Sequence, residues 1–341
     1  MRTADDLRQL QALPLSLKVA LPKDRIRQWV HEFGTDGVYV SFSGGKDSTV
    51  LLHIVRELYP DVPAVFFDTG LEYPEIREFV KTFENVEWLK PKMTFRQVIE
   101  KYGYPFISKE VSQQVWEVRH YGKEKAKRAL GKFDPDSEYN KRYGGRFSVE
   151  KYKFLLDENA PMISHKCCSV MKKSIAKNYE KQTGRLPILA TMAEESDLRR
   201  SKWIRFGCNA FEAKRKTSDP MSFWTESNVL QYIKQNQLPI CSVYGEIIEA
   251  NEIRGQMNIT DYEGIGKFTP ELTTTGCKRT GCMFCGFGCH LNKSGEGRFE
   301  QMKQTHPKQY EWIMKDWDAG GLGYKRVIDW INENGNLNIR Y

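Results

Sequence analysis

The run Val38-Tyr-Val-Ser-Phe-Ser-Gly-Gly-Lys-Asp-Ser48 is the feature that most narrows what this chain can fold into. Its first five residues predict a buried strand, and the apolar residues of Val50–Leu58 recur at helical spacing. A glycine-rich turn, Ser43–Ser48, lies between them. Gly44 and Gly45 permit positive φ and a close approach to the backbone. Because a helix start leaves N–H groups unpaired and carries the positive end of the helix dipole, the turn predicts an anion site.

The turn also indicates which anion it would hold. It is not a Walker A loop, because Val40 stands where the first glycine of Gly-x4-Gly-Lys would be. The amides of Ser43–Ser48 and the charge of Lys46 suit the phosphates of ATP with Mg²⁺. Asp47 and Ser48 are expected to be required for turnover. An ordinary turn between a strand and a helix is the alternative interpretation.

A second strand is predicted at Ala64–Phe67, and it ends in Asp68-Thr69-Gly70. Ligands of parallel sheets bind at the carboxyl ends of the strands, so these residues are expected beside the first turn. Asp68 is a candidate to hold Mg²⁺ or a ribose hydroxyl, and Thr69 and Gly70 are expected to let adenine approach the backbone. A turn or N-cap residue is the alternative for Asp68.

SGGKDS followed by FFDTGLEYPE resembles the adenine nucleotide α-hydrolase superfamily of PP-loop ATP pyrophosphatases, and within it the phosphoadenosine-phosphosulfate (PAPS) reductase family. Weaker motifs follow in the same order, over roughly residues 25 to 290. They are Lys166-Cys-Cys168 with Lys172, Glu195-Ser196 with Arg199, Pro220, Trp224-Thr225, Tyr232-Ile233 and Leu238-Pro239. The resemblance implies an α/β fold with a doubly wound parallel sheet, together with a helical insertion and a Cys-rich C-terminal region.

Three departures from the family pattern bear on the substrate. Ala190-Thr191-Met192 replaces Gly-x-Arg before the Glu-Ser pair, and Met171 replaces the arginine before Lys172. Both changes remove cationic contacts that a sulfonucleotide would use. Reductases of the family also carry a catalytic cysteine in a Glu-Cys-Gly-x-His context near the C-terminus, whereas no cysteine follows Cys289 here. Sulfonucleotide reduction is therefore the second choice.

Length and composition limit the domain organisation, the location in the cell and the chemistry of the cysteines. A chain of 341 residues usually forms one large or two medium domains. With the motifs above, we expect a nucleotide-binding α/β domain over residues 1–260 and a Cys-rich, helical region over residues 261–341. No stretch is long and apolar enough to span a membrane, and the N-terminus lacks the apolar core of a signal peptide. We therefore expect a cytoplasmic protein without a membrane partner. Thiols stay reduced there, so the 8 cysteines indicate metal or sulfur chemistry.

A basic insertion interrupts the first domain at about residues 108–160. Val111, Val115 and Val118 predict a helix with one apolar face. A stretch rich in basic residues with aromatic residues among them follows: Lys123, Lys125, Lys127, Arg128, Lys132, Phe133, Tyr139, Lys141, Arg142, Tyr143, Arg146 and Phe147. Such a mixture suits a phosphate backbone with stackable bases, and the net charge of +8 agrees. A solvated, partly disordered insertion is the alternative. Further helices are predicted around Phe299–Trp317 and Tyr324–Ile331.

The cysteines form a second motif, C-x4-C-x2-C-x3-C, made by Cys277, Cys282, Cys285 and Cys289. Four thiolates on glycine-rich backbone fit a [4Fe–4S] cluster or zinc, and the family resemblance favours the cluster. The resemblance also implies a second ligand set, because adenylyl-sulfate reductases use a Cys-Cys pair with a C-x2-C. That set would be Cys167, Cys168, Cys282 and Cys285. Closing a short loop costs less entropy than bridging distant segments, which favours the four C-terminal cysteines, here called the local quartet, as the ligands. Cys167 or Cys168 would then be the sulfur-handling nucleophile.

Together these features predict an ATP pyrophosphatase that adenylates an acceptor and lets sulfur replace its oxygen. The catalytic candidates are Lys46, Asp47, Asp68, Arg199, Cys167 and Cys168, and Arg199 is expected at the mouth of the cleft. The tail and the insertion look most like the sulfur-transfer ATPases of bacterial DNA phosphorothioation, and next like tRNA thiolases. That likeness implies nucleic acid as the acceptor and a cysteine desulfurase as the sulfur donor, and it leaves the oligomeric state open. A nucleotide-gated, non-catalytic scaffold that binds nucleic acid is the alternative of another class.

Overall fold

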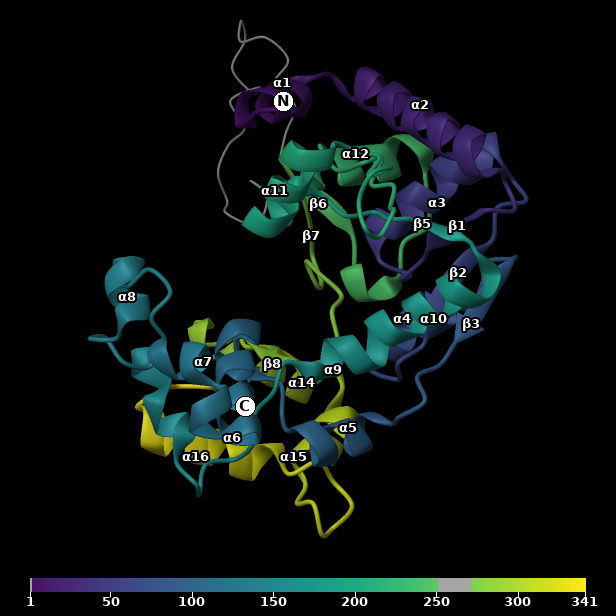
Figure 1. The fold of residues 1–341 in the computed structure, drawn as a ribbon. Helices are drawn as coiled ribbons and strands as arrows, with labels where there is room; N and C mark the ends of the chain where they lie inside the picture. The colour runs from purple at the N-terminus through teal and green to yellow at the C-terminus, as the bar shows by residue number, and fades with distance from the viewer. Residues whose placement is uncertain (1, 251–270) are drawn as a thin grey trace, which may run out of the picture. The chain divides into compact units, whose positions relative to one another are not determined.

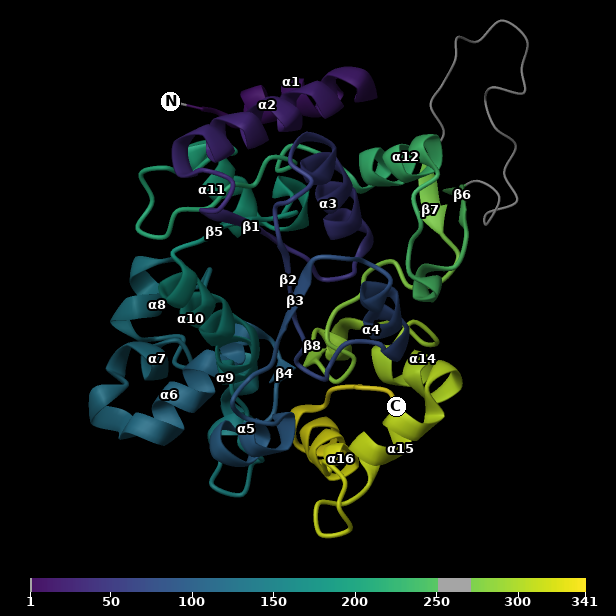
Figure 2. The ribbon, with the colours of Figure 1, turned by 90° about the vertical axis from the view of Figure 1, so that its right-hand side faces the viewer.

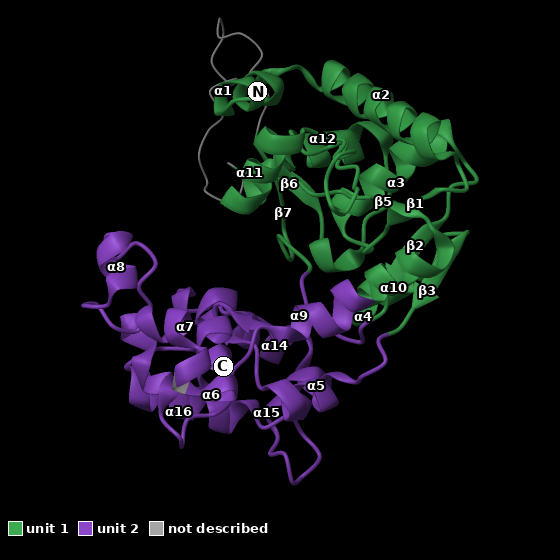
Figure 3. Ribbon diagram, viewed as in Figure 1, with its two compact units in different colours: residues 1–68, 72–90, 175–280 green, residues 69–71, 91–174, 281–341 purple. Residues whose placement is uncertain are grey.

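The computed structural model describes residues 2–250 and 271–341, which form two compact units (Figure 3). Unit 1 comprises Met1–Asp68, Glu72–Lys90 and Ile175–Thr280, and unit 2 comprises Thr69–Leu71, Pro91–Ser174 and Gly281–Tyr341, each apart from residues not described. Both units are therefore discontinuous in sequence. The expected domain boundary after residue 260 lies outside the described residues.

Unit 1 is built on a parallel sheet with strand order β3-β2-β1-β5. The strands are β1 (Val38–Ser41), β2 (Ala64–Phe67), β3 (Val86–Leu89) and β5 (Leu186–Ile188). In the register, Val40 lies opposite Ala64 of β2 and opposite Ile188 of β5. The strands predicted at Val38–Phe42 and Ala64–Phe67 are confirmed, as is the α/β fold class.

Both faces of this sheet are covered by helices (Figure 1; Figure 2). Side chains alternate along a strand, so Val38 and Val40 enter the larger core while Tyr39 enters a smaller cluster on the other face. There the ring of Tyr39 packs edge-on against Tyr179, with ring centroids 5.0 Å apart. Tyr179 belongs to α10 (Ser174–Thr183). Coverage of both faces is what the doubly wound class requires.

The larger core of unit 1 gathers the apolar faces of several helices around two fully buried tryptophans, Trp29 and Trp224. The indole N–H of Trp224 donates to the carbonyl of Lys18 at 2.8 Å, which satisfies its one polar atom in the core. The remaining helices of the unit are α1 (Ala4–Ala12), α2 (Leu15–Phe33), α3 (Lys46–Leu58), α4 (Pro74–Lys81), α11 (Asp197–Phe206) and α12 (Glu226–Asn236). An antiparallel pair, β6 (Ile247–Glu249) and β7 (Leu272–Thr274), completes it.

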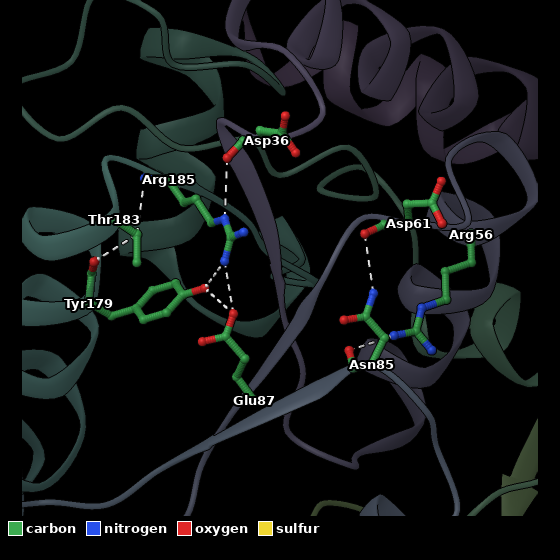
Figure 4. Close-up of polar contacts among 8 residues, drawn as sticks. All are labelled: Asp36, Arg56, Asp61, Asn85, Glu87, Tyr179, Thr183 and Arg185. Atoms are coloured by element: carbon green, nitrogen blue, oxygen red, sulfur yellow. Dashed lines mark hydrogen bonds and ion pairs between the residues drawn. The ribbon is translucent and has the colours of Figure 1, made fainter.

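Polar side chains fasten the strands of this sheet at their amino ends (Figure 4). Arg185, which precedes β5, donates to the carbonyl of Asp36 at 3.2 Å and to the Glu87 carboxylate at 2.8 Å. Asn85, which precedes β3, donates to the carbonyl of Asp61 at 3.2 Å. Arg56 in turn donates to the carbonyl of Asn85 at 2.9 Å. These bonds tie the loops at the end of the sheet opposite the Ser43–Ser48 turn.

Unit 2 is mainly helical, and its core surrounds Tyr324. The phenol of this fully buried residue donates to the carbonyl of Phe284 at 2.7 Å, and its ring packs against Phe106 and Phe299 at 5.1 and 5.8 Å. The helices are α5 (Phe95–Tyr102), α6 (Lys109–Lys125), α7 (Lys127–Gly131), α8 (Glu138–Arg142), α9 (Lys166–Cys168), α14 (Arg298–Thr305), α15 (Pro307–Met314) and α16 (Tyr324–Gly335). Two short strands, β4 (Phe106–Ile107) and β8 (Gly286–Phe287), pair in parallel.

The predicted helices of unit 2 are confirmed with one correction. Val111, Val115 and Val118 are buried on α6, and α16 covers the helix expected from Tyr324. The single helix predicted around Phe299–Trp317 is wrong, because α14 and α15 are separated at His306. Pro307 cannot continue a helix but suits the first position of a new one. Among the described residues, no helix has the length and apolar character needed to cross a bilayer.

Candidate functional site

The Ser43–Ser48 turn joins β1 to α3 as the sequence predicts. Gly44 has φ +69°, and a Cβ there would lie 2.7 Å from Val80 and 2.9 Å from Ile76, so the position requires glycine. Gly45 is the N-cap of α3 and provides no side-chain cap. The Ser48 hydroxyl lies 3.0 Å from that of Ser43 and accepts from the Ser43 N–H at 3.2 Å. These bonds hold the turn in one conformation at the helix start.

Lys46 is buried at the start of α3, although it is a lysine. Its ammonium group pairs with the Glu226 carboxylate at 3.0 Å and donates to the carbonyl of Lys278. Its backbone N–H donates to the phenol oxygen of Tyr244 at 3.2 Å. The Tyr244 phenol also bonds the Thr280 hydroxyl at 2.7 Å, and burial raises the pKa of Tyr244 to about 12. Lys278 contributes its carbonyl to the Lys46 ammonium, and Thr280 holds the phenol that Lys46 contacts, so this part of the chain surrounds the turn with polar groups.

The side chain of Asp47 has one carboxylate oxygen, Oδ1, that is buried without a hydrogen-bond partner among the described residues. Burial raises the pKa of this carboxyl, and the nearby Lys46 opposes that effect. A carboxylate oxygen in this situation is an open ligand position, because burying an unpartnered charged group costs free energy that a cation would offset.

Arg199 lies near this carboxylate, on α11. The Ser196 hydroxyl caps the helix by accepting from the Arg199 N–H at 3.3 Å, and the guanidinium pairs with the Glu195 carboxylate. Arg279 lies 3.7 Å from the same carboxylate. Burial lowers the pKa of Arg199, and the like charge of Arg279 lowers it further. Arg200 instead pairs with Asp197 at 3.5 Å on a more exposed face, since adjacent residues of a helix do not share a face.

Asp68 has a role that the sequence did not suggest. It is buried at the end of β2, and its carboxylate accepts from Arg77 of α4 at 2.9 Å. It does not cap α4, whose N-cap is Tyr73. Thr69 and Gly70 fall in unit 2, where the Thr69 hydroxyl accepts from the N–H of Leu71 at 3.2 Å and Gly70 has φ +72°. Their expected contacts with Mg²⁺ and adenine stay predictions.

The thiols of unit 2 gather around the Cys167–Cys168 pair. The two thiols hydrogen-bond to each other; this bond and burial raise the pKa of Cys167, while the bond lowers that of Cys168 to about 6. Cys282 and Cys285 are close enough that their charges raise the pKa of Cys167 further. Burial raises the pKa of Cys289 to about 11, and its sulfur lies 3.6 Å from the carbonyl of Cys285.

Cys277, the first member of the local quartet, belongs to unit 1. Its thiol donates to the phenol oxygen of Tyr73 at 3.7 Å, and its N–H donates to the carbonyl of Val243 at 2.9 Å. Cys241 is buried nearby, in keeping with a structural thiol. Within the described part of the chain, no three His, Cys, Asp or Glu side chains are arranged to hold a metal ion as they stand. Both ligand sets therefore stay predictions.

Sequence reasoning missed several of the residues that surround Lys46 and Asp47. Glu226, Tyr244, Lys278, Arg279 and Thr280 lie in no motif and come from segments remote from the turn. Only the basic and hydroxyl residues next to Cys277 could have drawn attention to this segment.

Comparison with known proteins gives one family. The family model described as the phosphoadenosine phosphosulfate reductase domain matches residues 37–286. The chain is 23% identical over 270 residues to a phosphoadenosine 5'-phosphosulfate reductase of Photobacterium profundum, over 79% of this chain and 83% of that protein. It is 40% identical over 73 residues to an uncharacterized protein of Methanocaldococcus jannaschii, over 20% of this chain but only 18% of that protein.

Among the solved structures that are similar to this chain is a phosphoadenylyl-sulfate (PAPS) reductase from Candida auris in a phosphate complex, with 14% sequence identity and a TM-score of 0.38. The match covers 71% of this chain and 91% of that chain.

Proposed function

Because the chain belongs to the phosphoadenosine phosphosulfate reductase domain family, we propose that it is an ATP pyrophosphatase that supports sulfur transfer into nucleic acid. In this reaction an oxygen of the acceptor attacks the α-phosphorus of ATP and pyrophosphate leaves. Sulfur then replaces the activated oxygen, and AMP leaves with that oxygen. DNA is the acceptor we propose first, and tRNA the second.

The observation that carries the proposal is the unpartnered Asp47 carboxylate oxygen at the glycine-rich turn. Mg²⁺ prefers oxygen ligands and is usually held by one or two carboxylates together with substrate phosphates. The Asp47 carboxylate fits that requirement, so it would hold the ion, which would neutralise charge on the departing pyrophosphate. The amides of the turn and the ammonium of Lys46 would bind the phosphates from the other side.

Two arginines complete the arrangement. Arg199 and Arg279 flank the Glu195 carboxylate, and the charges of both act on Asp47. Two guanidinium groups beside the turn suit the stabilisation of an α-phosphate on which negative charge develops. Arg199 is 41% exposed on its side chain, so it also remains accessible to an acceptor.

The methionines at the two departures from the family pattern support ATP over a sulfonucleotide. Met171 and Met192 are each 1% exposed. A buried thioether offers no charge and no N–H donor to a sulfate or phosphate group. The phosphates would therefore be bound by the turn and by Arg199, and both can bind the phosphates of ATP as well as those of a sulfonucleotide.

The thiols of unit 2 are the proposed sulfur site. The proximity of Cys167 to Cys168, Cys282 and Cys285 supports these four as ligands of a [4Fe–4S] cluster, with zinc as the other metal that four thiolates would suit. When bound, the cluster would supply electron transfer and sulfide chemistry. If the local quartet held the metal instead, Cys167 or Cys168 would carry sulfur as a persulfide, whose terminal sulfur would displace AMP. The other thiol of the pair would then break the S–S bond, leaving a Cys167–Cys168 disulfide for a dithiol to reduce. We propose a cysteine desulfurase as the donor.

Anaerobic release of pyrophosphate from ATP and Mg²⁺ tests the proposal, measured with and without DNA or tRNA. We expect release that depends on Asp47 and rises with one of the two nucleic acids. If ATP yields no pyrophosphate with either, the proposed function is wrong.

A second candidate function is reduction of PAPS or adenylyl sulfate. The names of the curated relatives favour it, and so does the grouping of a Cys-Cys pair with Cys282 and Cys285. Sulfite released from either sulfonucleotide in the presence of a dithiol reductant, without pyrophosphate release from ATP, would identify this activity. A protein that binds ATP and nucleic acid but turns over neither substrate would be a nucleotide-gated scaffold.

A further inference from the structure

The segment from Tyr139 to Ser148 in unit 2, which we call the arginine–aromatic loop, combines cations with exposed rings. Residues 141–148 are all exposed, and they include Lys141, Arg142 and Arg146 but no acidic residue. Among the described residues, these three cations form no ion pair with a carboxylate. Their charge is therefore available to a partner.

The rings of this loop form a short series in which neighbouring rings meet tilted or edge-on. Tyr139 and Tyr143 have ring centroids 4.9 Å apart, and those of Tyr143 and Phe147 are 5.8 Å apart. Tyr143 is 44% exposed and Phe147 is 38% exposed, which is unusual for large aromatic side chains. The guanidinium of Arg142 lies 5.7 Å from the centre of the Tyr143 ring, and that of Arg146 lies 5.7 Å from the Phe147 ring. Each of the two exposed rings, Tyr143 and Phe147, therefore has an arginine beside it.

The loop is anchored to a folded base. Asn140 is 2% exposed and donates to the carbonyls of Gly131 and Asp134 at 3.1 and 2.7 Å. Phe133 is also buried, and the N–H of Val149 donates to the carbonyl of Lys132 at 2.9 Å. Figure 3 shows α8 standing away from the helices of unit 2 around α6 and α16. The base would hold the exposed rings in place, which lowers the entropy lost on binding.

Two glycines shape the tip. Gly144 and Gly145 have φ +58° and +68°, and a Cβ at either would meet nothing within 4 Å. Successive left-handed residues turn the chain, and the N–H of Gly145 donates to the carbonyl of Asn140 at 2.9 Å. The turn brings Phe147 back against Tyr143 and leaves the backbone open to close approach.

We propose that the arginine–aromatic loop binds single-stranded DNA, stacking unpaired bases on Tyr143 and Phe147 while Lys141, Arg142 and Arg146 contact phosphates. Positive charge alone would suit any polyanion, but exposed rings beside the cations favour a strand whose bases are free to stack. The choice of DNA rests on the proposed function, whose first acceptor is DNA. The binding test uses no ATP, so its result stands even if no pyrophosphate is released.

The first experiment compares two labelled strands with the full protein by fluorescence anisotropy. One strand is oligo(dT) of about 16 nucleotides, within the span that a single-strand site covers, and the other is an abasic strand of equal length and charge. We expect oligo(dT) to bind at least about fivefold more tightly, since stacking of one base is worth ~1 kcal/mol or more. Equal binding of the two strands would overturn the stacking proposal without any variant.

The second experiment removes the charge. Arg142→Glu with Arg146→Glu should weaken oligo(dT) binding by more than about tenfold, and should reduce the slope of log affinity against log salt by about 1.4. The matched control is Lys303→Glu with Lys308→Glu, which changes the net charge equally at exposed positions on α14 and α15. If the control weakens binding as much as the loop variant, the attraction is general and the loop is not the site.

The third experiment removes the rings. Tyr143→Ala with Phe147→Ala should abolish the preference for oligo(dT) over the abasic strand and leave the salt slope unchanged. A far-UV spectrum and a thermal melt identify a variant that has lost its fold. Binding of duplex DNA, or of an RNA strand of the same length, about tenfold more tightly than oligo(dT) would overturn the assignment to single-stranded DNA.

Discussion

The backbone N–H of Lys46 donates to the phenol oxygen of Tyr244 across 3.2 Å, so the first amide of α3 already has a side-chain partner. The two residues are 198 positions apart in the sequence. Tyr244 is held in place by its bond to the Thr280 hydroxyl at 2.7 Å. A phosphate oxygen that accepts from the same N–H must therefore displace the phenol.

Tyr244→Phe should bind ATP more tightly, by up to about tenfold, because the N–H of Lys46 no longer has to exchange one partner for another. The dissociation constant for ATP with Mg²⁺, measured by titration calorimetry, checks this. Tyr179→Phe is the control, since it removes a phenol that bonds Glu87 and Arg185 at the opposite end of the sheet. Weaker ATP binding in Tyr244→Phe would show that the phenol contacts the nucleotide itself.

Asp47→Asn should separate stability from activity. Burial raises the pKa of Asp47, so the folded state holds this proton more tightly than the unfolded state does. Stability contributed by this group is therefore lost as pH rises from the unfolded value of 3.8 through the higher folded value, and it stays lost at neutral pH. A neutral amide avoids this loss, so we expect a higher melting temperature at pH 7 together with loss of pyrophosphate release.

Two measurements make this prediction specific. The melting temperature of Asp47→Asn should exceed that of the parent at pH 7, and the difference should shrink as the pH is lowered toward 4. Added Mg²⁺ and ATP should raise the melting temperature of the parent more than that of the variant. Asp61→Asn, at an exposed position, is the control. An active Asp47→Asn protein would remove Asp47 from the proposed mechanism.

Arg199→Ala should reduce acceptor-dependent turnover by one or more orders of magnitude, because its guanidinium is close enough for its charge to act on the Asp47 carboxylate. Arg200→Ala is the matched control, since Arg200 pairs with the exposed Asp197. Steady-state pyrophosphate release by both variants checks the difference. Equal rates for Arg199→Ala and the parent would assign Arg199 to an ion pair with Glu195 and nothing more.

Iron content should discriminate between the two sets of cysteine ligands. Protein isolated without oxygen should be brown, and Cys168→Ser and Cys285→Ser should each lose the iron and the acid-labile sulfide. Cys277→Ser should keep them, because the Cys277 thiol already donates to the phenol oxygen of Tyr73. Cys208→Ser is the control for loss of a thiol without a motif. Loss of iron from Cys277→Ser, with retention in Cys168→Ser, would favour the local quartet, and a colourless zinc protein would rule out the cluster.

The sequence predicted the elements whose signals are local. The strand, turn and helix around Ser43–Ser48 follow from apolar periodicity and two glycines, and the structure confirms them. The same kind of signal placed α6 and α16. It failed between α14 and α15, where the apolar spacing continues on both sides of His306 and the break depends on one proline, Pro307.

The partners of the turn could not be predicted in this way. Glu226, Tyr244 and Lys278 reach Lys46 only because the chain folds back on α3, and no sequence pattern marks a residue that meets another 232 positions earlier. Asp68 shows the same limit, since its ion pair depends on how α4 turns Arg77 toward β2.

By itself, the sequence determined that this chain makes a parallel α/β sheet with a glycine-rich turn between a strand and a helix, because strand and helix periods and glycine positions are properties of adjacent residues. Only the tertiary structure decided which thiols lie together. Cys167 is remote in sequence from Cys282 and Cys285, yet the fold brings it close to both. The charges of Cys167, Cys285 and Cys289 all act on the buried Tyr324, so packing of the core around this residue sets which of these side chains meet, and that packing depends on contacts remote in sequence.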